Sequence, residues 1–265
     1  MGRIIAVTNQ KGGVGKTTTG INLAAALTRT RRRVLLVDLD PQGNATMGSG
    51  VSKDQVGRTS YDLLLAEVPW DEVRQKTAAG YDLLPANGHL SGAEVELVGQ
   101  EGREHRLRNA LASARAQYDY IFIDCPPALN LLTVNALVAA RSVLIPMQCE
   151  YFALEGLSAL VATIRRVRQT LNPELAIEGL LRTMYDPRNS LAGEVSDQLT
   201  RHFGDKLYRT VIPRNVRLAE APSHGSSVLD YDPQSRGAQA YLALAGEMLR
   251  RDQAATEALN PEETP

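Results

Sequence analysis

The chain is poor in cysteine, in aromatic residues and in long apolar runs. Only two cysteines, Cys125 and Cys149, occur among its 265 residues, which excludes a framework of disulfide bonds. Aromatic residues make up 5% of the sequence, and no apolar run reaches the roughly 20 residues of a membrane-spanning helix. Because no signal peptide precedes the first apolar segment, we expect a cytoplasmic protein.

Excess charge of either sign is also missing. The formal net charge is −1, so no global basic field indicates a nucleic-acid partner, and any such site has to be local. The four histidines are scattered and show no metal-binding spacing. With 43% hydrophobic and 22% charged residues, the composition is typical of a soluble globular protein.

A glycine-rich loop follows the first apolar segment. Residues 4–7 (IIAV) predict a buried strand, and residues 8–19 (TNQKGGVGKTTT) predict a loop that opens a helix. In such a loop the backbone N–H groups converge on a phosphate, and the helix N-terminus favours negative charge. A plain glycine-rich turn without a nucleotide is the alternative. We expect phosphate contacts from Gly12, Gly13, Val14, Gly15, Lys16, Thr17 and Thr18.

Two further apolar segments end in an acidic residue. Residues 34–38 (VLLVD) end at Asp38, with Asp40 two positions later, and residues 118–124 (YDYIFID) end at Asp124. Ligands of parallel α/β sheets bind beyond the carboxyl ends of the strands, so these acids are expected beside the glycine-rich loop. The Asp-Pro and Gln-Gly pairs of residues 40–43 are also common in turns. In that alternative, Asp38 and Asp40 only cap a turn.

Apolar strands alternate with amphipathic helices along the whole chain. Strands are expected over residues 34–38, 81–85, 118–124, 142–146, 176–183 and 211–213, and helices over residues 17–30, 92–116, 130–140, 154–171, 193–203 and 237–251. This alternation predicts an α/β fold with a doubly wound, mostly parallel sheet and helices on both faces. We expect one domain over residues 1–253 and a disordered tail over residues 254–265.

The glycine-rich loop departs from the ordinary phosphate-binding pattern. Gln10 stands where the usual loop has a glycine, and Lys11 supplies a second lysine, giving KGGVGKTT. This sequence resembles the deviant Walker A motif of the ParA/Soj-type chromosome and plasmid partition ATPases, which are P-loop NTPases related to MinD. The resemblance extends to residues 40–44 (DPQGN), 124–127 (DCPP), 181–189 (LRTMYDPRN) and 211–225 (VIPRNVRLAEAPSHG).

The resemblance implies an ATPase that uses ATP and Mg²⁺ and forms a homodimer with ATP. It assigns catalytic roles to Lys16, to Lys11, which would cross to the partner's nucleotide, and to Asp40, which would orient water. It places Mg²⁺ near Thr17, Asp38 and Asp124. It further implies that Thr183, Met184, Pro213 and Asn215 hold the adenine, largely through backbone groups.

The resemblance also implies non-specific double-stranded DNA and a ParB-like centromere-binding protein as partners, with localisation to the nucleoid. The DNA contacts fall on Arg188 and Arg217. Residues 182–217 contain seven basic and four acidic residues, a local excess of positive charge that suits phosphate contacts.

Three alternative functions predict different features of the sequence. A MinD-like membrane-associated ATPase should end in a basic amphipathic helix, whereas residues 260–263 (NPEE) are acidic and break a helix, so we expect no membrane partner. A nucleotide-binding module without hydrolysis should lack Lys16, Asp40 or Asp124, and all three are present. A metabolic P-loop kinase or synthetase would need a second substrate site, for which the sequence shows no motif.

Overall fold

The eight strands found within residues 2–259 belong to one sheet. The computed structural model describes residues 2–259 and orders the strands β3-β4-β2-β5-β1-β6-β7-β8. The strands are β1 (Arg3–Val7), β2 (Val34–Asp38), β3 (Gln75–Lys76), β4 (Asp82–Leu84), β5 (Tyr120–Asp124), β6 (Ser142–Gln148), β7 (Ala176–Tyr185) and β8 (Leu207–Pro213). Only the β3–β4 pair is antiparallel among the described residues. The mostly parallel α/β fold expected from the sequence is therefore confirmed.

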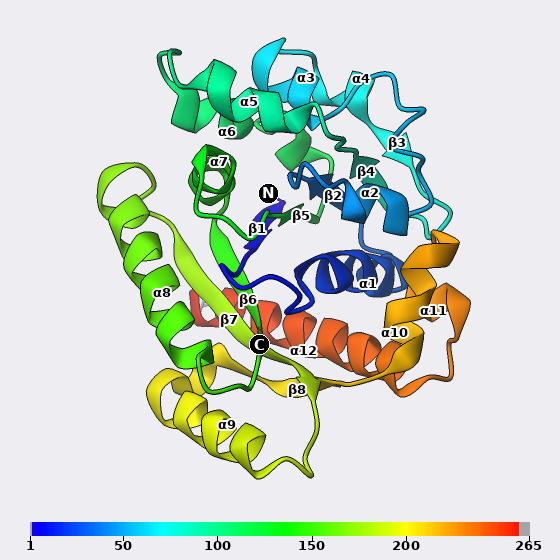
Figure 1. Ribbon diagram of the computed structural model, residues 1–265, viewed down its shortest axis with the longest axis vertical. Coiled ribbons are helices and arrows are strands. Elements are labelled where there is room, and N and C mark those ends of the chain that lie inside the picture. The colour runs from blue at the N-terminus through cyan, green and yellow to red at the C-terminus, as the bar shows by residue number, and fades with distance from the viewer. Residues whose placement is uncertain (1, 260–265) are drawn as a thin grey trace.

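Helices cover both faces of this sheet (Figure 1). They are α1 (Lys16–Arg29), α2 (Asn44–Gly48), α3 (Ser60–Leu65), α4 (Trp70–Val73), α5 (Leu90–Leu97), α6 (Arg106–Ala110), α7 (Leu131–Ala139), α8 (Ala153–Thr170), α9 (Ser190–Phe203), α10 (Val216–Glu220), α11 (Val228–Tyr231) and α12 (Arg236–Leu259). Single 3₁₀ turns occur at η1 (Arg103–His105), η2 (Ala114–Ala116), η3 (Gly204–Lys206) and η4 (Ala221–His224).

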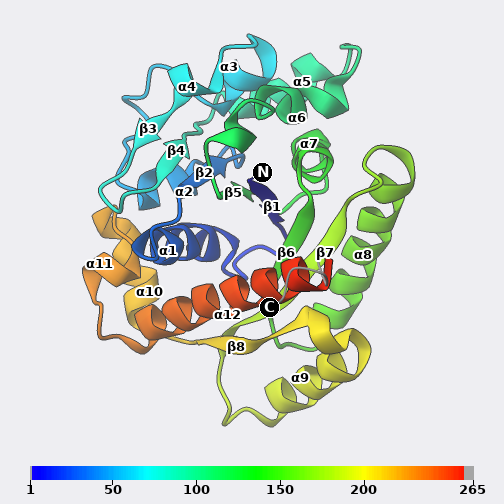
Figure 2. The same ribbon diagram turned by 180° about the vertical axis from the view of Figure 1, so that it is seen from behind.

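The strands are buried on both faces because their side chains alternate between two cores. In β1, Ile4 and Ala6 belong to the core beneath α3 to α9, whereas Ile5 and Val7 belong to the core beneath α1 and α12. Figure 2 shows α12 lying beside α1 and across β8. The continuous apolar runs of the sequence therefore mark central strands of a doubly covered sheet.

The single helix expected over residues 92–116 is wrong. The structure divides this segment into α5, η1, α6 and η2. Helix α5 ends at Leu97, and Gly102, directly before η1, adopts a left-handed backbone (φ 67°) that a continuous α-helix does not contain and that glycine reaches without steric cost.

The disordered tail expected over residues 254–265 differs from the structure over residues 254–259, which are helical. The helix α12 continues to Leu259, and residues 260–265 lie outside the described residues. Residues 252–259 (DQAATEAL) are rich in strong helix formers. Asp252 also accepts ion-pair and hydrogen-bond contacts from Arg3 and Tyr120 of the sheet. Propensity and anchoring together extend the helix.

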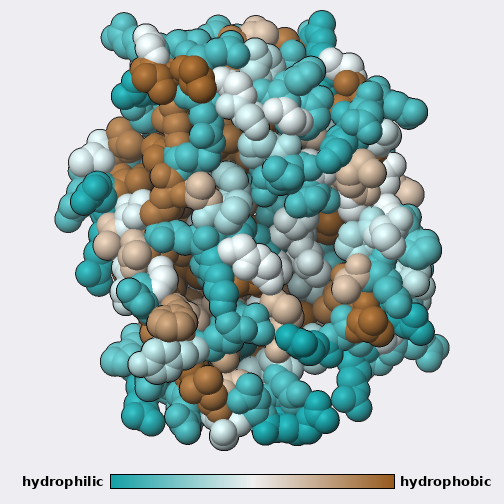
Figure 3. Space-filling view, in the orientation of Figure 1, coloured by the Kyte–Doolittle hydropathy of each residue, from teal (hydrophilic) through white to brown (hydrophobic). Residues whose placement is uncertain are grey.

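The surface carries one conspicuous apolar region on the side seen in Figure 1. Apolar side chains gather at the upper left, over α5 to α7 (Figure 3). Val95 and Val98, in and directly after α5, are 77% and 60% exposed. Within residues 2–259, no helix combines the length and the apolar character required to cross a membrane.

Candidate functional site

The glycine-rich loop joins the carboxyl end of β1 to the N-terminus of α1. Gly13 and Gly15 both have left-handed backbones (φ 72° and 87°), which a side chain would strain. The Lys16 ammonium donates a hydrogen bond to the Lys11 carbonyl at 3.2 Å, and the Thr183 hydroxyl donates one to the Val14 carbonyl at 2.7 Å. The loop is therefore curled, and its free N–H groups and the helix N-terminus remain for an anion.

Space for a ligand lies directly over this loop. A Cβ atom built on Gly12 would meet no protein atom within 4 Å, so the protein itself leaves room there. Lys16 is only 7% exposed; burial lowers the pKa of its ammonium, and the nearby carboxylates of Asp124 and Asp40 oppose that shift. A bound phosphate group would stabilise the charged form of this buried ammonium.

Two carboxylates lie side by side beneath the loop, because Asp38 and Asp124 are paired across β2 and β5. The Thr17 hydroxyl donates to Asp124 Oδ2 at 2.7 Å, while Asp124 Oδ1 is buried and has no hydrogen-bond partner among residues 2–259. Asp38 Oδ2 accepts hydrogen bonds from the N–H and the hydroxyl of Thr46, at 2.8 and 2.7 Å.

The electrostatics of this pair suit a bound cation. Burial raises the pKa of Asp38 to about 6, against the hydrogen bonds from Thr46. Burial and the neighbouring Asp38 raise the pKa of Asp124 well above its ordinary range. A hydroxyl, two carboxylates and an orphaned carboxylate oxygen fit Mg²⁺, which prefers oxygen ligands and usually takes one or two carboxylates besides phosphates.

Asp40 lies at the mouth of this arrangement. Its N–H donates to Asp38 Oδ1 at 3.2 Å, and its own Oδ1 accepts the N–H of Gln42 at 3.0 Å. The side chain is 8% exposed and borders the cavity above the loop. The turn role considered from the sequence is thus real, but it leaves Asp40 Oδ2 for a ligand or a water molecule.

One cavity of about 1090 Å³ unites most of the predicted site. Its lining includes Gly12, Gly13, Gly15, Lys16, Thr17, Thr18, Asp40, Thr183, Met184, Pro213 and Asn215. Val14, Asp38 and Asp124 are buried and do not line the cavity. The volume suits a ligand of nucleotide size.

Comparison with known proteins decides the family. A family model described as an AAA domain matches residues 2–177. Soj of Bacillus subtilis, named as a sporulation initiation inhibitor protein, is 55% identical over 94% of this chain and 98% of its own length. The chromosome partitioning protein ParA of Myxococcus xanthus is 54% identical over 95% of this chain and 89% of its own length. The chain belongs to the ParA/Soj family of ATPases.

Solved structures share this fold over nearly the whole ParA/Soj-type chain. One is described as cobyrinic acid a,c-diamide synthase from Mycobacterium smegmatis with bound ADP and magnesium. It is 39% identical, with a TM-score of 0.84 over 96% of this chain and 97% of that chain.

The second lysine of this ParA/Soj-type loop lies outside the cavity. Lys11 is paired with Glu150, which follows β6, and the side chains are 44% and 43% exposed. The Lys11 N–H donates to Asn9 Oδ1 at 3.0 Å. Sequence reasoning did not find Glu150, because nothing in the spacing of the two residues marks them as neighbours.

The two candidate DNA contacts follow the carboxyl ends of adjacent strands, and each carries an acidic partner. Arg188, after β7, donates to both carboxylate oxygens of Asp186, at 2.9 and 2.7 Å. Arg217, in α10, pairs with Glu220 at 2.8 Å and with Asp232 at 3.3 Å. The excess of positive charge counted along the sequence is therefore partly neutralised in the fold.

A third arginine of the same segment points inward. Arg182 donates to the Ser196 hydroxyl at 2.8 Å and to the carbonyls of Tyr208 and Arg209, at 2.9 and 3.2 Å. Its inclusion in a surface charge cluster is corrected by these contacts.

The cavity also has walls that sequence reasoning missed. Ile21, Met47, Pro222 and Tyr241 all line it. Tyr241 of α12 is fully buried, and its hydroxyl lies 3.2 Å from that of Thr19 in α1. No local motif marks these apolar residues, so only tertiary packing identifies them.

Proposed function

We propose that this chain is a DNA partitioning ATPase that dimerises and binds DNA in its MgATP form. The observation that carries the proposal is one cavity shared by the glycine-rich loop, the residue after β2 and the ends of β7 and β8. The partitioning relatives are 54–55% identical to this chain, whereas the synthase structure is 39% identical, so partitioning is preferred. ATP or ADP and Mg²⁺ are the ligands, since that synthase structure is described with bound ADP and magnesium and another one with a bound ATP analog and magnesium.

The phosphate side performs the chemistry. Lys16 and the loop N–H groups bind the β- and γ-phosphates, and Thr17, Asp38 and Asp124 hold Mg²⁺ directly or through water. Bound Mg²⁺ neutralises charge that develops on the phosphates during transfer. Asp40 orients a water molecule for in-line attack. The lining residues Thr183, Met184, Pro213 and Asn215 are the ones that we assign to the adenine.

The second lysine links hydrolysis to assembly. Lys11 and Lys16 cannot share one set of phosphates easily, since two close ammonium groups repel each other. Lys11 is instead exposed and held only by Glu150, in a solvent-accessible pair of the kind that exchanges readily. It is free to cross to the nucleotide of a second subunit, so ATP joins two loops and hydrolysis separates them.

Light scattering tests this dimer. The Asp40→Ala protein with ATP should be dimeric, and adding Lys11→Ala should abolish the dimer. A dimer of unchanged affinity in the double variant contradicts the role of Lys11.

Arg188 and Arg217 supply the DNA contacts. If each touches one phosphate, an ATP dimer makes four contacts, and its affinity should fall with salt at a log–log slope of about −3.6. Their half-buried acidic partners, Asp186 and Glu220, keep solvent access and can release them to phosphates at small cost. Dimerisation thus allows non-specific binding to the DNA of the nucleoid, because it doubles the number of phosphate contacts. Hydrolysis stimulated by a ParB-like protein separates the dimer and releases the DNA.

The deciding experiment is a gel shift on unrelated DNA sequences with ATP, with ADP and without nucleotide. We expect a shift with ATP alone, loss of it in Arg217→Glu, and retention in Arg166→Glu, which makes the same charge change on an exposed position of α8. Equal binding by the ADP form would overturn the coupling between nucleotide and DNA.

A further inference from the structure

The edge strand β8 contains an irregularity that regular pairing with β7 cannot explain. Leu180 pairs with Leu207 and Arg182 pairs with Val211. Three residues of β8, at positions 208–210, therefore stand opposite the single residue 181 of β7. Two extra residues form a bulge, and their backbone groups need partners other than the neighbouring strand.

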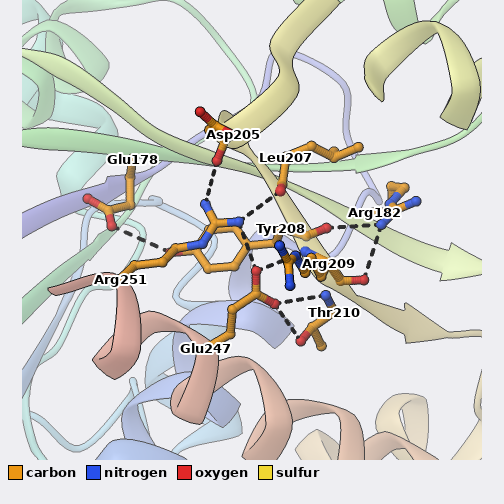
Figure 4. Close-up of polar contacts among 9 residues, drawn as sticks. All are labelled: Glu178, Arg182, Asp205, Leu207, Tyr208, Arg209, Thr210, Glu247 and Arg251. Atoms are coloured by element: carbon orange, nitrogen blue, oxygen red, sulfur yellow. Dashed lines mark hydrogen bonds and ion pairs between the residues drawn. The ribbon is translucent and has the colours of Figure 1, made fainter. Parts of the chain in front are cut away.

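Two oppositely charged side chains satisfy this bulge from opposite sides (Figure 4). Glu247 of α12 accepts the N–H groups of Arg209 and Thr210 at 2.9 and 2.8 Å, together with the Thr210 hydroxyl at 2.8 Å. Arg182 of β7 donates to the carbonyls of Tyr208 and Arg209. Consecutive N–H groups of a regular strand point to opposite edges, so their meeting at one carboxylate requires the bulge.

Glu247 is itself held in place. It is 7% exposed, and Arg251, one helical turn further along α12, donates to its Oε1 at 2.8 Å. Arg251 also donates to the Leu207 carbonyl at 2.8 Å, and its guanidinium lies 4.1 Å from the centre of the Tyr208 ring. The bulge is therefore fixed by a buried network rather than by chain propensity.

The carboxyl end of the same strand borders the nucleotide cavity. Ile212, Pro213 and Asn215, directly after the bulge, line it. Tyr241, less than two turns before Glu247 on α12, lines the cavity from the side of α1. A shift of the bulge would therefore move Pro213 and Asn215 relative to Tyr241.

We propose that Arg182 and Glu247 are positioning residues for base recognition, because they fix the bulge that places Pro213 and Asn215 against the purine of the nucleotide. This inference rests on the proposed function, since it requires the nucleotide to occupy the cavity with its base toward β8.

The test compares MgATP with magnesium tripolyphosphate, which occupies the phosphate side without a base. In Glu247→Gln, one bulge N–H faces an amide donor instead of a carboxylate oxygen, so ATP affinity should fall roughly tenfold while tripolyphosphate affinity stays unchanged. Arg182→Lys should act in the same direction, because one ammonium cannot replace the planar fork.

Glu178→Gln is the matched control. Glu178 is a similarly buried carboxylate that pairs with Arg3 and lies 3.4 Å from the Tyr208 hydroxyl, without contacting the backbone of the bulge. It should leave the ratio of the two affinities at the wild-type value. A wild-type ratio in both Glu247→Gln and Arg182→Lys would overturn the proposal and leave both residues with a structural role alone.

Hydrogen exchange on the wild-type chain tests the link between the bulge and the base even if a variant fails to fold. Amide exchange over residues 207–212 should slow with MgATP and not with magnesium tripolyphosphate, whereas equal protection by both ligands would overturn the proposal. Failure of the proposed function would be distinct, because it would appear in the gel shift as DNA binding that does not depend on ATP, and not as a change in the ratio of the two affinities.

Discussion

The two sides of the nucleotide cavity are built in different ways. The phosphate side lies at the ends of β1, β2 and β5, whose pairing is regular throughout. The base side lies at the ends of β7 and β8, whose pairing shifts register twice and where Met184 has a left-handed backbone (φ 48°). The phosphate side, at the central strands, is therefore built largely from one short contiguous loop. The base side, near the sheet edge, depends for its geometry on side chains that are distant in sequence.

Two glycines show the same difference between the phosphate side and the base side. A Cβ on Gly12 of the phosphate side would meet open space. A Cβ on Gly179 of β7 would lie 2.5 Å from the Tyr208 ring and 2.9 Å from the Lys206 carbonyl. One glycine leaves room for a ligand, and the other leaves room for the neighbouring strand.

The largest expected effect breaks the chemistry of the phosphate side. Asp40→Ala should retain ATP binding but lower turnover by about 100-fold or more, as loss of a positioning or proton-accepting group usually does. Phosphate release and ATP affinity, measured separately, check this. Hydrolysis at the wild-type rate would reduce Asp40 to a turn residue.

The next effect breaks the packing of the base side. Gly179→Ala forces Tyr208 or the β8 backbone to move, and should lower the free energy of unfolding by about 1–3 kcal/mol. Urea denaturation measures it. Gly156→Ala is the control, because this helical glycine has no neighbouring atom within 4 Å, and alanine there should not destabilise the fold.

Gly12→Ala should do the reverse of Gly179→Ala. Its stability should match the wild type, but its Cβ occupies the space in which phosphate oxygens approach the loop, so ATP affinity should fall roughly tenfold. Titration calorimetry and a thermal melt report the two quantities. Gly57→Ala, equally open but outside the loop, should alter neither. A destabilised Gly12→Ala would contradict the contrast.

The smallest expected effect is on the pH dependence of stability at the base side, through Glu247. Burial raises the pKa of Glu247, but the hydrogen bonds from Thr210, Arg209 and Arg251 outweigh it and leave the pKa below its ordinary value of 4.5. The carboxylate therefore stabilises the fold above that pH, and the stabilisation is lost as the pH falls through the lowered pKa. Urea midpoints should decline less steeply below about pH 4.5 in Glu247→Gln than in the wild type. Parallel declines would refute the assignment.

The sequence by itself determined the doubly wound sheet, the phosphate side and the family. Apolar runs ending in Asp38 and Asp124 and the loop from Lys11 to Thr17 are contiguous signals, and local chemistry fixes what each can do. Periodicity failed where local geometry overrode it, as at Gly102, where the helix expected over residues 92–116 is interrupted.

Only the tertiary structure decided which distant residues meet. Glu150 pairs with Lys11, Tyr241 borders the cavity, and Arg182 turns from an expected surface charge into a partner of the β8 bulge. Each contact joins segments whose separation in sequence carries no pattern, because packing of helices on the sheet, and not spacing along the chain, brings them together.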